Sequence, residues 1–147
     1  MNEFVIVSDS TVDLPKEYLQ SKQVPIISLS YIMDGVTYEE MDGLSHKEFF
    51  GKLRAGSLPT TSQINPEQAR EALLAKEGKD ILYIGFSSGL SGSYNSVRMA
   101  AEDLKEEYPD INIIAIDSLC ACMGEGLLLY KALELKEHGM SMEEIAK

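Results

Sequence analysis

The residues ILYIGFSSGLSGSYNS, from Ile81 to Ser96, join an apolar run to a helical pattern through a loop rich in serine and glycine. The first six residues, Ile81 to Phe86, form an uninterrupted apolar segment, which is typical of a strand buried on both faces of a parallel sheet. After the loop, the apolar residues from Val97 to Leu104 follow the i, i+3, i+4, i+7 spacing of an amphipathic helix. A strand, a loop and a helix in this order indicate an α/β fold.

Two more apolar runs predict strands of the same sheet. Phe4 to Val7 is followed by the turn and cap residues Ser8 to Thr11. Ile111 to Ile116 is followed by Asp117-Ser118 and by a long helix that runs to about Glu137. Strands that alternate with helices predict a parallel sheet with helices on both faces, which is a Rossmann-like three-layer α/β arrangement.

The segment between these strands contains the antiparallel part of the predicted sheet. Val24 to Met33 indicates one strand, and Asp34-Gly35 is a hairpin signal before Val36 to Tyr38. We therefore expect the parallel sheet to be mixed at one edge. The capping box Ser45-His46-Lys47-Glu48 predicts the start of a helix, and residues 58 to 65 are expected to form a loop.

Composition excludes several classes of function. The chain has 147 residues, 44% of them hydrophobic, and a formal net charge of −11, so it can bury a core but repels nucleic acid and anionic membranes. The apolar region Leu119 to Leu135 contains charged residues and is too polar to cross a bilayer. Cys120 and Cys122 are too few for a metal site and too close in sequence for a disulfide. We expect a cytoplasmic protein without a metal or a cofactor.

Three of the expected loops follow the carboxyl ends of apolar strands, at Ser8 to Leu14, Ser87 to Tyr94 and Asp117 to Gly126. In an open parallel sheet these ends lie at one edge, where ligands bind. The hydroxyl groups of these loops are therefore expected to converge. The segment PTTSQ, residues 59 to 63, is expected to join them, although no strand precedes it.

The triplet Ser91-Gly92-Ser93 has the composition of an anion site at the start of a helix. Gly92 lets the backbone approach a ligand closely, the helix N-terminus supplies free N–H groups, and serine hydroxyls add uncharged donors. Together they would suit a phosphate or a carboxylate. The alternative is that Ser91 or Ser93 only caps the helix, because serine is a favoured N-cap residue.

Two enzymatic alternatives use the same loops. Ser91 lies in a segment that nearly matches G-x-S-x-G, and Ser91, Asp117 and His138 have the chain order of a hydrolase triad. Ser93 replaces the last glycine of that motif, and His138 is expected at a helix end on the opposite edge of the sheet, which disfavours a small serine hydrolase. Asp9 would be the candidate for phosphoryl transfer. Standard nucleotide-binding motifs are absent from the sequence.

Four segments, in this order along the chain, resemble the DegV family. They are SDSTVDLP at residues 8 to 15, PTTSQ at 59 to 63, SSGLSGSY at 87 to 94, and Asp117-Ser118 with Met123-Gly124-Glu125-Gly126. The resemblance implies a bacterial protein with the EDD fold, about twice as long as this chain. Residues 1 to 147 would be its N-terminal α/β domain, and the C-terminal domain that covers the lipid would be absent.

The family resemblance also implies a function. DegV proteins bind a long-chain fatty acid between their two domains, and some are the acyl-binding subunit of a fatty acid kinase, presenting the carboxylate to an ATP-binding subunit. A member of this family would be a lipid-binding protein with no catalytic residues of its own. Its partners would be the fatty acid and such a kinase subunit. An isolated N-terminal domain would expose an apolar wall and could self-associate.

The residues that match the family's motifs are candidates for contact with the carboxylate. Thr61 and Ser91 are the expected hydroxyl contacts, and Ser62, Gly92 and Ser93 are expected beside them. This sequence has Ser93 where the family often has threonine, which keeps the hydroxyl. The basic residues that the family's C-terminal domain contributes to the site are not in this chain.

Overall fold

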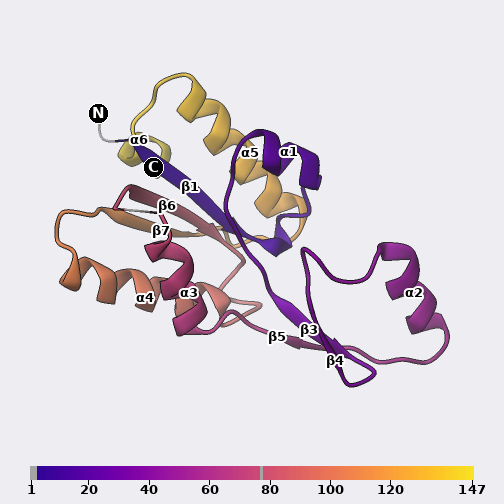
Figure 1. Cartoon of the computed structure of the whole chain (residues 1–147). Coiled ribbons are helices and arrows are strands. Elements are labelled where there is room, and N and C mark those ends of the chain that lie inside the picture. The colour runs from indigo at the N-terminus through magenta and orange to yellow at the C-terminus, as the bar shows by residue number, and fades with distance from the viewer. Residues whose placement is uncertain (1–2, 77) are drawn as a thin grey trace.

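The computed structural model describes residues 3–76 and 78–147 and contains a four-stranded parallel sheet at its centre (Figure 1). The strand order is β2-β1-β6-β7. The strands are β1 (Phe4–Asp9), β2 (Ile26–Ile27), β6 (Asp80–Gly85) and β7 (Ile113–Asp117). The apolar runs predicted from the sequence as buried strands, residues 4–7 and 81–86, form the central pair β1 and β6, which are buried on both faces.

Helices cover both faces of this sheet, and they confirm the α/β prediction. One face is covered by α3 (Pro66–Leu74) and α4 (Ser93–Glu107). The other is covered by α1 (Lys16–Ser21), α5 (Met123–Glu137) and α6 (Met142–Ile145) (Figure 1). No helix in the described part of the chain is long and apolar enough to cross a membrane.

Side chains along β6 alternate between the two faces of the sheet. Ile81 and Tyr83 pack with the residues of α3 and α4, whereas Leu82 and Ile84 pack with those of α5. Successive residues of a strand point to opposite faces, so a strand covered on both sides has an uninterrupted apolar sequence. This is the physical reason why residues 81–86 predict the centre of the fold.

The antiparallel strands form a sheet of their own, with strand order β4-β3-β5. Its strands are β3 (Ser30–Met33), β4 (Val36–Glu39) and β5 (Thr60–Ser62), and α2 (His46–Arg54) connects β4 to β5. Residues 30–62, here called the arm, project from the rest of the described chain, here called the body (Figure 1). The expected mixed edge of the main sheet is therefore corrected, because the four strands of the body are all parallel.

The predicted strand Val24 to Met33 is divided between the two sheets. At the break, the Leu29 N–H donates to Ser10 Oγ at 2.9 Å, and Gln68 Nε2 donates to the Ser28 carbonyl at 2.8 Å. Because side chains take up these backbone groups, the ladder of β2 cannot continue, and β3 begins in the arm. The expected loop at residues 58–65 also differs, since β5 pairs with β3 over Thr60–Ser62.

Local signals placed the helix ends correctly. The Ser45 hydroxyl accepts the Glu48 N–H and the Glu48 carboxylate accepts the Ser45 N–H, which is the predicted capping box of α2. Gly139, with φ of +83°, follows the end of α5. A 3₁₀ turn, η1 (Ser10–Val12), follows β1 directly and begins the loop that approaches α5.

Candidate functional site

The loops after β1, β6 and β7 meet at the edge where the parallel strands end, as the sequence predicted. The Phe86 N–H donates to Asp9 Oδ2 at 2.9 Å, which connects the β6 loop to the end of β1. The Ser88 N–H donates to Asp117 Oδ1 at 3.1 Å, and the Ser87 N–H donates to the Cys120 carbonyl at 3.0 Å. The β6 loop is thus held between its two neighbours.

The end of β5 joins this edge from the arm. The Ile64 N–H donates to Ser93 Oγ at 3.1 Å, so the residues after β5 are bonded to the first residue of α4. The side-chain amide of Gln63 lies directly against the backbone of Gly92, since a Cβ atom there would be 2.3 Å from Gln63 Oε1. The PTTSQ and SGS segments, far apart in the sequence, are brought side by side.

The two serines of the SGS triplet have different environments. Ser93 is fully buried, and its hydroxyl accepts the Ile64 N–H. Ser91 is half-buried; its Oγ accepts the Ser93 N–H at 3.1 Å and lies 2.9 Å from Ser93 Oγ. In the described structure Ser93 therefore connects β5 to α4, and Ser91 is the hydroxyl of the pair that reaches the surface.

The first turn of α4 contains no charged residue and begins at Gly92, which offers no side-chain cap. The first N–H groups of a helix have no intrahelical acceptor and lie at the positive end of its dipole. A cap by Ser91 satisfies one of these groups and leaves others for an anion. The two interpretations of the triplet, a helix cap and an anion cradle, are therefore compatible.

Thr61 and Ser62 are both exposed but point to opposite faces of the arm's sheet. Thr61 pairs with Tyr31, whose own partner on β4 is Tyr38, so these three side chains share one face. Ser62 pairs with Ser30 and lies on the other face. A small head group on one face of β5 can contact only one of the two hydroxyls.

Exposed leucines lie in two of the loops at this edge, and a third, Leu58, precedes β5 at the end of that strand farther from the edge. Leu58 before β5, Leu90 in the β6 loop and Leu119 in the β7 loop are 85%, 67% and 76% exposed, more than any other large apolar side chain in the described structure. Each is an isolated residue in a loop, so no periodic pattern in the sequence drew attention to them. Leu90 and Leu119 give the hydroxyl-rich edge an apolar rim.

The geometry does not support the two enzymatic alternatives. His138 follows the end of α5, and its Nδ1 lies 2.7 Å from the Glu134 carbonyl. That helix end lies beside the start of β1, since Lys136 Nζ donates to the Phe4 carbonyl at 2.7 Å, whereas Ser91 follows the far end of β6. A triad through Ser91 would need a hydrogen bond across the length of the sheet.

Asp9 is not open to a phosphorylated substrate either. Its side chain is fully buried. One carboxylate oxygen accepts the Thr11 N–H at 3.0 Å, and the other accepts the Tyr83 hydroxyl and the Phe86 N–H, both at 2.9 Å. Asp9 therefore holds the loops of this edge together by hydrogen bonds from the protein interior and does not face a ligand.

Glu125, in the first turn of α5, belongs to one of the four segments that resemble the family, but the sequence assigned it no role in the site. It is fully buried, with Oε2 2.5 Å from Thr11 Oγ1 and Oε1 3.4 Å from Ser8 Oγ. Burial and the neighbouring Asp9 raise the pKa of Glu125 to about 8. The available signal was the flanking glycine: a Cβ on Gly126 would lie 2.3 Å from the Val12 carbonyl oxygen, and this close packing brings η1 against α5.

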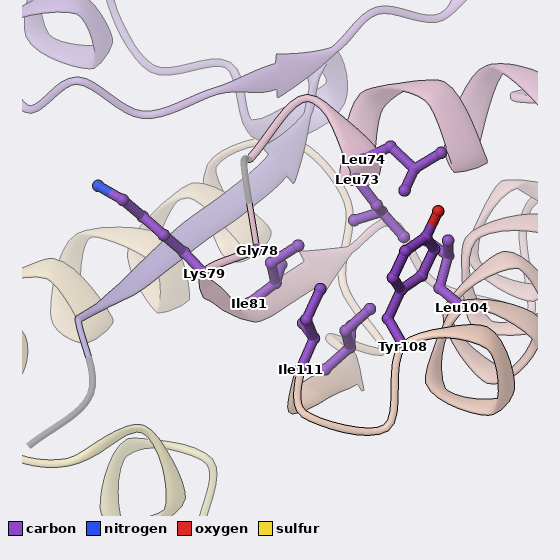
Figure 2. Close-up of a pocket in the computed structure, with 9 residues that line it drawn as sticks. Leu73, Leu74, Gly78, Lys79, Ile81, Leu104, Tyr108 and Ile111 are labelled. Atoms are coloured by element: carbon purple, nitrogen blue, oxygen red, sulfur yellow. The ribbon is translucent and has the colours of Figure 1, made fainter.

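A hollow of about 200 Å³ lies at the opposite end of the sheet, between the ends of α3 and α4 (Figure 2). Leu73, Leu104 and Ile111 are among the apolar side chains that line it. It contains none of the hydroxyl-rich segments, because it adjoins the start of β6 rather than its end. It is therefore separate from the edge that carries the sequence motifs.

Comparison with known proteins identifies the family. A family model described as "Uncharacterised protein, DegV family" matches residues 3–147. A DegV domain-containing protein of Clostridium perfringens is 43% identical over 149 aligned residues, which cover 99% of this chain and 51% of that protein. The chain thus spans about half the length of the curated relatives it matches.

Two solved structures are similar over almost the whole chain. A stearic acid-binding protein from Eubacterium ventriosum superposes with a TM-score of 0.87 at 31% identity, covering 97% of this chain and 50% of its own. DegV, a fatty acid binding protein from Bacillus subtilis, gives a TM-score of 0.86 at 31% identity and covers 99% and 52% respectively. From the family model, the sequence relatives and the shared fold together, we conclude that this chain belongs to the DegV family.

Proposed function

We propose that this protein binds a long-chain fatty acid and holds its carboxylate at the edge formed by β5 and the start of α4. The observation that carries the proposal is the junction between these segments, where the Ile64 N–H bonds to the buried Ser93 hydroxyl. This contact brings the end of β5 beside the SGS triplet. The solved relatives that share this fold are described as binding fatty acids.

In this proposal Thr61 and Ser91 contact the carboxylate, with backbone N–H groups of the first turn of α4, beside Gly92, as further donors. Ser93 holds the two segments together from below, and Ser62 lies on the other face of β5. Neutral donors suit a carboxylate in a chain with a net charge of −11, since they provide local attraction without needing a basic patch. The exposed Leu90 and Leu119 at this edge suit an acyl chain leaving the head group.

The finer parts of the proposal concern partners. The protein would present the bound carboxylate to the ATP-binding subunit of a fatty acid kinase in the bacterial cytoplasm and would supply no catalytic group itself. The exposed leucines would also favour self-association of the chain when no lipid or partner covers them. Size-exclusion chromatography with and without fatty acid tests this last expectation.

Lipid extraction tests the main proposal. The full-length gene product is purified from a bacterial host without added lipid, extracted with organic solvent and analysed by mass spectrometry. We expect about one fatty acid per folded protein. A well-folded sample that contains no fatty acid, and takes none up when oleate is added, would overturn the proposal.

Alanine variants test the assigned contacts. Thr61→Ala and Ser91→Ala are each expected to weaken fatty acid binding roughly tenfold, because a hydrogen bond to a charged group contributes about 1.5 kcal/mol. Thr37→Ala is the matched control, since it removes an exposed threonine hydroxyl from β4 of the same sheet. Ser62→Ala reports which face of β5 the ligand uses, and a loss with this variant alone would reverse the assignment of Thr61.

A further inference from the structure

Two carboxyl groups, those of Asp9 and Glu125, are buried together beneath the proposed ligand edge. Both side chains are fully buried, and neither forms an ion pair with a lysine, arginine or histidine of the described residues. A buried charge without a cation partner is costly unless several hydrogen-bond donors surround it. The donors around this pair therefore decide which carboxyl group carries a proton.

Asp9 has enough donors for an ionised carboxylate. The Thr11 N–H, the Tyr83 hydroxyl and the Phe86 N–H all donate to it, at 3.0, 2.9 and 2.9 Å. The Thr11 hydroxyl lies 2.7 Å from the same carboxylate. Asp9 is thus satisfied as an acceptor on both oxygens.

Glu125 has too few donors to be ionised. The side-chain donors within reach of it are two hydroxyls, at 2.5 Å on Thr11 and 3.4 Å on Ser8, and the Asp9 carboxylate that also lies beside it offers no proton. The Ser8 hydroxyl has one proton and donates it to the Ile84 carbonyl at 2.7 Å. The single proton of the Thr11 hydroxyl can go to Asp9 or to Glu125, but not to both. A proton on Glu125 resolves this conflict, because Glu125 can then donate to Thr11 while Thr11 donates to Asp9.

We propose that Glu125 is a positioning residue that acts as a neutral, proton-donating carboxyl group. The hydrogen-bonded chain Glu125–Thr11–Asp9 then holds the loops of the ligand edge together. Loss of the Glu125 proton loosens this edge and weakens ligand binding. Glu125 belongs to α5, Thr11 to η1, and Asp9 accepts the N–H of Phe86, at the start of the loop that carries Ser91. The effect on ligand rests on the proposed function.

The surrounding groups favour the neutral form. The titratable groups that interact with Glu125 are Asp9 of β1, Tyr83 of β6 and Cys122 before α5, and the carboxyl groups of Asp13 after η1 and Glu40 after β4 lie beyond Cys122. None of them is a cation. The α5 dipole favours an ionised group at this position, but burial and the charge on Asp9 outweigh it and raise the pKa of Glu125 to about 8.

The raised pKa of Glu125 fixes the direction in which the free energy of unfolding changes with pH. The ordinary pKa of a glutamate is 4.5, and Glu125 keeps its proton in the folded protein up to about 8. Between these values the unfolded chain has lost the proton and the folded protein has not, so the free energy of unfolding falls as pH rises through this window and levels off above it. Loosening of the native edge itself begins only near the upper value.

The first test reads the proton directly. The full-length gene product is labelled with ¹³C at glutamate Cδ, and the carboxyl resonance of Glu125, assigned by its loss in Glu125→Gln, is followed with pH. We expect a transition near pH 8. A transition below about pH 5, the range of an ordinary glutamate, would overturn the proposal. This measurement on the unmodified protein stands even if the variant is poorly folded, because in uniformly ¹³C-labelled protein the resonance can also be assigned through the backbone signals of Gly124 and Gly126.

The second test uses the neutral mimic. Glu125→Gln keeps a donor toward Thr11 but cannot ionise, so its unfolding free energy is expected to lack the decline between about pH 4.5 and about 8 that the unmodified protein shows. Glu106→Gln, which makes the same change at an exposed position of α4, is the control and should follow the unmodified protein. Identical slopes for all three proteins would contradict the assignment.

The third test concerns the ligand. Affinity for a fluorescent fatty acid, below its aggregation concentration, is expected to fall about tenfold between about pH 7 and about pH 9, since the protonated fraction of a group with a pKa of about 8 falls by that factor. Glu125→Gln should bind with little pH dependence. Equal pH dependence in both proteins would refute the link to binding. Absence of binding at every pH, with the ¹³C transition present, would overturn the proposed function while supporting the proton on Glu125.

Discussion

The body and the arm of this molecule are stabilised in different ways. In the body, Val7, Leu82 and Tyr83 are fully buried between two layers of helices. In the arm, Met33 is buried, but α2 buries no residue completely. The Tyr31 ring packs against the rings of Tyr38 and Phe49, with 5.3 Å between ring centroids in each pair. Apolar burial is the dominant favourable contribution to folding, so the arm has a much smaller share of it.

The difference matters because the proposed site is divided between the two regions. Ser91 belongs to the body, and Thr61 belongs to the arm. Segments with little buried apolar area open at lower free energy than the core does. We therefore expect the arm to move Thr61 relative to a fixed Ser91, and the contacts that join arm to body to control the site.

The largest expected effect is a cavity in the body. Leu82→Ala removes a fully buried side chain from the central strand β6 and should lower the free energy of unfolding by about 4 kcal/mol. Phe50→Ala, on α2, removes a larger side chain that is 50% exposed, and should cost about 1 kcal/mol or less. Urea denaturation measures both. A cost for Phe50→Ala equal to that of Leu82→Ala would show that the arm is part of the same core.

Two glycine-to-alanine variants compare a closely packed glycine of the body with an open glycine of the arm. In Gly126→Ala the new Cβ would lie 2.3 Å from the Val12 backbone oxygen, so η1 and α5 must separate, at a cost of about 3 kcal/mol. Gly51→Ala is the matched change in α2, where nothing lies within 4 Å of the new Cβ. It should stabilise that helix by about 0.5–1 kcal/mol. Thermal unfolding of both variants distinguishes them, and destabilisation by Gly51→Ala would contradict an unpacked arm helix.

One of the bonds that anchor the base of the arm, between the residues after β5 and the start of α4, can be removed by one substitution. Ser93→Ala leaves the Ile64 N–H without its buried acceptor and should cost about 1–3 kcal/mol. Hydrogen exchange should become faster at residues 60–64 and remain slow in β6. Ser62→Ala, an exposed serine of the same segment, is the control for stability. Unchanged exchange in β5 would mean that other contacts hold the arm in place.

The smallest expected effect is local to the arm. Ser45→Ala removes the capping box of α2 and should cost about 1 kcal/mol, confined to that helix. Hydrogen exchange of residues 46–54 is the appropriate measurement, because global unfolding of the body would report little of it. Faster exchange in α4 or α5 would instead indicate that α2 supports the body.

Parts of the fold that depend on neighbouring residues were predicted well from the sequence. The runs at residues 4–7 and 81–86 became the central strands, and the Ser45 capping box formed as expected. The division of Val24 to Met33 was not predicted. It depends on Ser10 and Gln68, which take up backbone groups at residues 28 and 29 from other parts of the chain.

In the candidate site, too, some features could be predicted from the sequence and others could not. The hydroxyl-rich loops could be located from the sequence, and the resemblance of their motifs to the family made Thr61, Ser91 and their neighbours the candidate contacts. The opposite orientation of Thr61 and Ser62 depends on the register between β3 and β5, and register changes by one residue without any change in sequence composition.

The sequence by itself determined the α/β class, the buried strands and the hydroxyl-rich loops, because periodicity and capping act between residues close in the chain. Only the tertiary structure decided that the antiparallel strands form a separate arm, that Ser93 is a buried connection, and that Glu125 lies against Thr11 and Asp9 without a cation. These features depend on contacts between residues that are far apart in the chain. Thr11 and Glu125, for example, are more than a hundred positions apart and meet only in the folded protein. The protonation of a buried carboxyl group depends on its burial and on the hydrogen-bond donors around it. Both are defined only in the folded protein.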